Sequence, residues 1–243
     1  MGRLTMAQWS RFPGFPTAIQ VLQCGTMSDS PDQPEDVDDA DDVANETDAR
    51  LADGLAIIWE AYRMDEIPRA TAAARALVTD QSQHGEAWFW YGCCLERTGD
   101  YRAADKAFLR ASKAKVEPQN TPFRVSWRHF QHAVESAGDT LPPKLKAALE
   151  EVSLVLADYA EPILLEGFDD PEVMGLFVGP ERGDLMEGGA AQLTPRIYLF
   201  RRSHEHGCSG RREFDNEVQQ TLYHELGHYL GYDEDQLDAL GRG

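Results

Sequence analysis

Cysteine is scarce in this sequence, which has four in 243 residues: Cys24, Cys93, Cys94 and Cys208. Cys93 and Cys94 are adjacent and cannot easily pair with each other, and no two cysteines have CxxC spacing. This scarcity argues against a domain held together by disulfides. It favours a reducing compartment, and we expect the protein to be cytoplasmic.

Long apolar runs are also absent. No stretch reaches the roughly 20 residues that a membrane-spanning helix needs, so we expect no membrane partner. The short apolar run at residues 12–24 is a poor signal peptide. Pro13 and Pro16 interrupt it, and Gln23 stands where a small residue would be required. Either Met1 or Met27 can therefore be the native start.

Positive charge is in short supply. Lysine and arginine number 23 against 42 acidic residues, for a formal net charge of −19. Nothing in such a chain offsets the charge of phosphates, so we expect no nucleic-acid partner. Residues 29–48 hold ten acidic side chains and no basic one. We expect this run to be disordered and residues 1–48 to form an acidic N-terminal segment.

Helical periodicity begins at Ala49 and continues to Gly138. Within it, residues 87–118 resemble a tetratricopeptide repeat, whose characteristic offsets are occupied by Trp88, Gly92, Leu95, Gly99, Tyr101, Ala104, Phe108, Ala111 and Pro118. A shift of about 34 residues places Ala70 opposite Ala104 and Asp65 opposite Gly99. Residues 51–83 therefore resemble a weaker preceding repeat. The alternative is an ordinary bundle of helical hairpins.

Several residue types in the clearer repeat have a packing role. Gly92 and Ala104 would let two helices approach closely, Tyr101 and Phe108 would fill the gap between them, and Gly99 would turn the chain. A repeat alone cannot cover its apolar face, so we expect the helix at residues 123–138 to cap the stack. The predicted helical domain spans residues 49–138.

The remaining residues, 141–243, predict a small α+β domain. A helix at residues 144–152 comes first. Three short runs rich in branched or aromatic residues and bounded by turn residues predict strands, at residues 153–159, 174–180 and 196–202. In the last run, Ile197 and Leu199 alternate with Tyr198 and Phe200. A long helix, capped near Phe214–Asn216 and ending at Gly231, and a short helix at residues 234–241 complete the domain.

Two histidines bracket a glutamate in the sequence HELGHYLGYDED, residues 224–235. His224 and His228 are four residues apart, so on a helix both lie on one face and can bind one tetrahedral zinc ion. Glu225 lies further round the helix, where it would act as general base toward zinc-activated water in peptide hydrolysis. The alternative is a surface helix with two solvated histidines.

A third zinc ligand must come from the few residues that follow. Gly231 can adopt the left-handed conformation that ends a helix and reverses the chain. Such a turn brings Glu234 toward the metal, in the pattern HExxHxxGxxE. Asp233 and Asp235 are neighbours that could take its place, and we prefer Glu234 over Asp235 on spacing.

Residues 141–241 resemble the minimal zincin metallopeptidase family. The resemblance is carried by LPPKLKAALEEV, GLFVG, RIYLFRR and above all LYHELGHYLGYDEDQLDALG. It implies a compact zincin-like α+β fold in which His224, His228 and Glu234 bind zinc and Glu225 is the general base. Like that family, this chain lacks the methionine turn of the metzincins.

Segments near this motif suggest roles in substrate binding and in a second metal site. The run RIYLFRR would hold an extended peptide substrate by backbone pairing, or be an ordinary core strand. In SHEHGC, residues 203–208, His204, His206 and Cys208 would share a face and could bind a second metal if extended, although the glycines favour a mobile loop. The arginine pairs at 201–202 and 211–212 would orient a substrate carboxylate or simply be solvated.

Together these patterns predict a cytoplasmic zinc metallopeptidase that acts on a peptide or protein substrate. Its helical repeats would recruit a protein partner or cover the cleft. A competing hypothesis is a non-catalytic binding protein, in which the repeats contact partners and zinc only stabilises the C-terminal domain.

Overall fold

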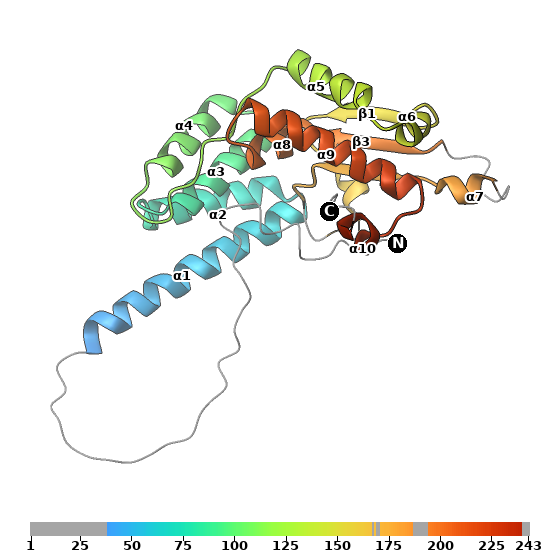
Figure 1. Ribbon diagram of the computed structural model, residues 1–243. Helices are drawn as coiled ribbons and strands as arrows, with labels where there is room; N and C mark the ends of the chain where they lie inside the picture. The colour runs from blue at the N-terminus through green and yellow to red at the C-terminus, as the bar shows by residue number, and fades with distance from the viewer. Residues whose placement is uncertain (1–37, 167, 169–170, 187–193, 240–243) are drawn as a thin grey trace, which may run out of the picture. The chain divides into compact units, whose positions relative to one another are not determined.

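The computed structural model describes residues 38–166, 168, 171–186 and 194–239. Its contacts divide the chain after Gln119 into two compact units. The described part of the first unit, residues 38–119, is helical, and that of the second, residues 120–239, combines helices with a small sheet (Figure 1). The predicted order, a helical region followed by a small α+β domain, is confirmed.

Within residues 38–119, the helical unit has four helices, α1 (Asp38–Arg63), α2 (Ile67–Asp80), α3 (Gly85–Arg97) and α4 (Tyr101–Ser112). Each packs on the next along the chain, and α1 also contacts α3. Ile58, Ala70, Cys94, Ala104 and Phe108 are among the residues that form its buried core. Residues 38–48, which we expected to be disordered, begin α1, where the side chains of Glu46 and Arg50 form an ion pair.

The two helical hairpins share a turn that recurs after 34 residues. The first turn has Asp65 at φ 57°, and the second has Gly99 at φ 80°. Glu66 N donates to Ala61 O at 2.8 Å in the first, and Asp100 N donates to Leu95 O at 3.0 Å in the second. The same left-handed residue and the same hydrogen bond thus close both turns, which supports a repeated unit.

The packing roles expected in the second repeat are met in all but one case. A Cβ atom added to Gly92 would lie 2.6 Å from the Phe108 ring, so only glycine permits this approach. Ala104 is fully buried and Phe108 is nearly so. Tyr101, which we expected between the helices, is instead 46 % exposed, because it is the first residue of α4 and faces away from the core.

The second unit contains a three-stranded sheet of order β1-β3-β2. The strands are β1 (Ser153–Ala157), β2 (Gly175–Val178) and β3 (Arg196–Phe200). The central strand, β3, pairs in parallel with β1 and antiparallel with β2. All three lie within the segments that the sequence predicted as strands.

Helix α9 (Arg211–Tyr229) packs on β2 and β3 (Figure 1). The other helices of this unit are α5 (Trp127–Asp139), α6 (Pro143–Leu149), α7 (Arg182–Met186), α8 (Arg201–Gly207) and α10 (Glu234–Ala239), with a 3-10 helix, η2 (Pro162–Leu165). Ile197 and Leu199 of β3 pack in one apolar cluster with residues of α5, α6 and α9. Phe200 belongs to a second, smaller cluster, against which Tyr198 packs. The alternation predicted for β3 is therefore confirmed.

Helix α5 belongs to the second unit, although we expected it at the end of the helical domain. Its apolar face, formed by Phe130, Ala133, Val134 and Ala137, packs in the same cluster as Phe214 of α9. The unit boundary accordingly falls at residues 119–120, before α5, whereas the sequence had suggested a boundary after it.

No helix in the described residues is long and apolar enough to cross a membrane. The described cysteines, Cys93, Cys94 and Cys208, are buried, and no disulfide joins any two of them.

Candidate metal centre

Helix α9 carries both histidines of the HExxH sequence on one face. The Nε2 atoms of His224 and His228 lie 2.9 Å apart, and the rings meet nearly edge to face at 81°. The helix begins at Arg211 with Gly210 as its N-cap, earlier than the cap expected near Phe214–Asn216. The histidines occupy its last two turns, where Leu222, Leu226 and Tyr229 anchor the opposite face in the core.

The turn after α9 is a Schellman motif. Gly231 has φ 84°, Tyr232 N donates to Gly227 O at 3.0 Å, and Gly231 N donates to His228 O at 2.9 Å. This is the pattern by which a left-handed residue ends a helix and reverses the chain. The turn predicted at Gly231 therefore forms.

A capping box starts α10 directly after this turn. The Asp233 carboxylate accepts from Gln236 N at 2.9 Å, and the Gln236 side chain accepts from Asp233 N at 3.0 Å. Leu237 packs so closely on α9 that a Cβ on Gly227 would lie 2.4 Å from its Cδ2. These contacts place Glu234, the first residue of α10, beside the two histidines.

His224, His228 and Glu234 form a group whose ligand atoms all lie within 4.8 Å of one another. Glu234 Oε1 is 3.2 Å from His228 Nε2, and Glu234 Oε2 is 3.6 Å from His224 Nε2. Among the described residues, Asp233 and Asp235 are not part of this group. The Asp233 carboxylate is already engaged as the helix cap.

The donor set fits a tetrahedral zinc ion. With zinc–ligand distances near 2.05 Å, two donors at tetrahedral corners would be roughly 3.3 Å apart. The two imidazole nitrogens are 2.9 Å apart, and each lies 3.2 or 3.6 Å from one of the two Glu234 oxygens, distances on either side of that value. His228 Nδ1 lies 3.1 Å from the Tyr232 carbonyl, an arrangement that orients Nε2 toward the metal position. Sequence reasoning missed Tyr232 because its contribution is a backbone oxygen.

Glu225 is buried beside this group and against strand β2. Burial raises the pKa of Glu225, while the charges of His224 and His228 and a hydrogen bond from the Phe177 backbone act to lower it. A Cβ on Gly175 would lie 3.0 Å from Glu225 Oε1 and 2.5 Å from Thr221 Cγ2. Gly175 therefore leaves the space that Glu225 occupies. Neither Gly175 nor Phe177 was singled out for the site, since only tertiary packing brings β2 to α9.

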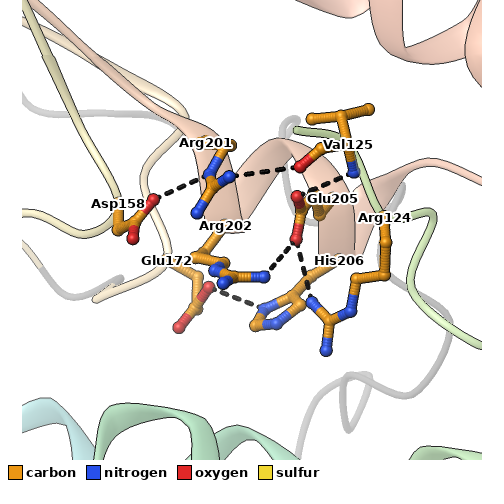
Figure 2. A network of polar contacts seen from close by, with 8 residues as sticks. All are labelled: Arg124, Val125, Asp158, Glu172, Arg201, Arg202, Glu205 and His206. Carbon is orange, nitrogen blue, oxygen red and sulfur yellow. Dashed lines mark hydrogen bonds and ion pairs between the residues drawn. The ribbon is translucent and has the colours of Figure 1, made fainter. Parts of the chain in front are cut away.

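The SHEHGC segment is not a mobile loop. Its first five residues form most of α8, and Ser203, His204, Glu205, His206 and Cys208 are all buried. Figure 2 shows why charged residues are tolerated here. The carboxylate of Glu205, which is fully buried, accepts hydrogen bonds from Arg124 at 2.9 Å, from Arg202 at 2.7 Å and from Val125 N at 3.0 Å. Arg201 pairs with Asp158 at 2.7 Å. The Arg201–Arg202 pair thus braces the fold and is not solvated, whereas Arg211 and Arg212 are exposed.

The three candidate ligands in this segment do not come together. The two ring nitrogens of His204 form hydrogen bonds with the Phe200 carbonyl and the Thr221 hydroxyl. The ring of His206 pairs with the Glu172 carboxylate at 3.1 Å. Burial raises the pKa of the Cys208 thiol to about 12. In the part of the chain that the structure describes, they form no metal-binding group.

Comparison with known proteins agrees with this geometry. Residues 149–243 match a family model described as Zincin-like metallopeptidase. The matched range contains all three strands and both helices of the candidate metal centre. No match was found among curated proteins.

Proposed function

We propose that the C-terminal unit, which matches the zincin-like metallopeptidase model, is a zinc-dependent peptidase with His224, His228 and Glu234 as metal ligands and Glu225 as general base. The observation that carries the proposal is the convergence of one carboxylate and two imidazoles, on two helices, to within 4.8 Å. A buried glutamate beside a three-ligand set is the arrangement that hydrolytic zinc sites require.

The remaining chemistry follows from the positions of the side chains. Zinc, when bound, supplies a Lewis acid that polarises the peptide carbonyl and makes water more acidic. Glu225 takes the proton of the attacking water on its carboxylate and passes it to the leaving amine. The burial that raises its pKa favours this exchange, because it makes the carboxylate a stronger base. His228 and Glu234 are partly exposed, at 24 % and 15 % of their side chains, so the site is open to solvent on that side.

Strand β2 is better placed to hold a peptide than β3, which the sequence suggested. Both edges of β3 are already paired, with β1 and β2. Strand β2 lies at the edge of the sheet, and its Phe177 backbone reaches Glu225. An extended substrate that pairs with the outer edge of β2 would bring its scissile bond next to the general base.

For the helical unit we retain the role of recruiting a protein partner. The repeated turns at Asp65 and Gly99 support a tetratricopeptide-like stack, and such stacks commonly present binding surfaces.

Replacement of Glu225 by Gln tests the catalytic proposal. The variant should bind zinc as the wild type does but lose peptide cleavage by at least about 100-fold, the usual contribution of a general base. The measurements are metal content and digestion of a peptide library. Glu150→Gln, which makes the same change at an exposed position of the same unit, is the control and should keep activity. Wild-type protein that binds zinc, melts lower when the zinc is removed and cleaves no peptide would instead favour the competing hypothesis of a zinc-stabilised binding module.

A further inference from the structure

A second group of metal-binding side chains lies in the helical unit. The segment after α4 returns to the start of α3, where Gly85 N donates to Val116 O at 2.8 Å and Val116 N donates to Gln83 O at 3.0 Å. The approach is so close that a Cβ on Gly85 would lie 2.1 Å from the Glu117 carbonyl oxygen. Glu117 itself is held at φ 46°. These contacts fix Glu117 next to the first residues of α3.

His84, Glu86 and Glu117 each offer a ligand atom within 4.8 Å of the other two. His84 Nε2 is 3.5 Å from Glu117 Oε2. The His84 side chain is only 7 % exposed and Glu86 is buried, whereas the Glu117 side chain is 60 % exposed. The group is therefore enclosed on the inner side and open at Glu117, a route by which an ion can enter.

The protein satisfies this group only in part: Trp90 hydrogen-bonds to Glu86, but one ring nitrogen of His84 is left over. His84 Nδ1 is buried and has no hydrogen-bond partner among the described residues. Burial raises the pKa of Glu86 to about 7, and the charge of Glu117 adds to the effect. Burial also lowers the pKa of His84, against the charges of Glu117 and Asp48. Two carboxylates beside a neutral imidazole repel each other, and a cation between them would remove that repulsion.

We propose that His84, Glu86 and Glu117 bind one divalent transition-metal ion, separate from the centre on α9. One imidazole nitrogen and two carboxylate oxygens are a donor set that zinc, manganese and iron(II) accept. The ion would join the segment after α4 to the start of α3 and so close the second helical hairpin. Binding would stabilise the helical unit, because the unfolded chain does not hold the three ligands together.

The test uses the full chain with zinc as the probe. His224→Ala/His228→Ala removes the α9 site and should leave one equivalent of zinc in a calorimetric titration. Adding Glu117→Gln, which is exposed and nearly isosteric, should weaken that binding by more than about tenfold, since even outer-shell partners contribute that much. Asp53→Asn removes the same charge from an exposed position of the same unit and should leave binding unchanged.

Metal content of otherwise unaltered protein provides an independent measurement. The wild type should hold two equivalents of zinc, and Glu117→Gln should hold one with its peptide cleavage unchanged. Zinc should also raise the melting temperature of the double-histidine variant, and Glu117→Gln should abolish that rise. The proposal is overturned if the double-histidine variant binds no zinc, or if Glu117→Gln binds it as tightly as Asp53→Asn does. Neither outcome bears on catalysis at Glu225, which the Glu225→Gln experiment tests by itself.

Discussion

Glu225 and Glu234 are nine residues apart and face the same two histidines, yet their surroundings act on them in opposite directions. Burial dominates at Glu225 and raises its pKa. At Glu234 burial also acts to raise the pKa, but the hydrogen bond with His228 and the charges of both histidines outweigh it, and the pKa is lowered. The two shifts thus favour an ionised Glu234, as its proposed role of metal ligand requires, and a Glu225 that can accept a proton.

The identity of the third ligand is testable at this scale. Glu234→Ala should weaken zinc binding by more than about tenfold, because it removes a direct ligand where even an outer-shell partner costs that much. Asp235→Asn should leave the affinity unchanged, since Asp235 is outside the group formed by His224, His228 and Glu234. Competition with a chromogenic chelator measures both. A loss of affinity in Asp235→Asn with none in Glu234→Ala would assign the third ligand to Asp235.

At the scale of elements, the centre depends on how α9 meets α10. The Schellman turn at Gly231 and the capping box between Asp233 and Gln236 are local motifs, and the contact between Gly227 and Leu237 sets the separation of the two helices. Two of the proposed ligands belong to α9 and one to α10, so the turn between the helices determines the geometry of the proposed site.

Gly231→Ala should therefore impair zinc binding without removing any ligand. Alanine at φ 84° costs about 1–2 kcal/mol, and its Cβ would lie 3.1 Å from Glu181 Oε2. We expect a lower unfolding free energy and a several-fold weaker zinc affinity, measured by urea denaturation and chelator competition.

Gly210→Ala is the matched control. Gly210 has φ −169°, which any residue adopts, and a Cβ there meets nothing within 4 Å. If Gly231→Ala behaves like this control, the turn does not determine where Glu234 lies.

At the scale of the molecule, the chain contains two units with separate cores. In the second, α8 passes through the interior as a charged helix whose residues find partners in distant segments: Arg124, Asp158 and Glu172 (Figure 2). Leaving such a buried charge without its partner typically costs 3–5 kcal/mol. The stability of this unit should therefore be sensitive to protonation.

His204 gives that sensitivity a definite sign. Burial lowers its pKa to about 4, although the hydrogen bond to the Phe200 carbonyl acts to raise it. The unfolded chain, with an ordinary histidine pKa near 6.5, binds the proton more readily. Stability should thus be full above pH about 6.5 and fall, by about 3 kcal/mol, as the pH drops toward 4. Urea denaturation of metal-free protein across this range measures the loss.

Two variants isolate this contribution. His204→Gln should be less stable at pH 7 but should show a flatter dependence on pH below 6.5. His132→Gln, at a position whose side chain is 71 % exposed, should keep the wild-type dependence. If the stability of His204→Gln depends on pH as that of the wild type does, the acid sensitivity belongs to other groups.

The parts that the sequence determined by itself depend on neighbours along the chain. The four-residue spacing of His224 and His228, the turn at Gly231 and the alternation along β3 are local, because helix period, strand period and glycine conformation need few distant contacts. The recurrence of Asp65 and Gly99 after 34 residues was readable for the same reason.

Tertiary structure alone decided the rest. Helix α5 has an apolar face that would suit either core, and only packing assigned it to α9. The charged residues of α8 could be buried only because their ion-pair partners come from positions 34 to 81 residues away in the sequence. Likewise, β2 contacts Glu225 and Glu117 contacts His84 only because the fold brings together segments that are distant in the sequence. Periodicity shows which face of an element is apolar, but which surface covers that face depends on packing between segments far apart in the chain.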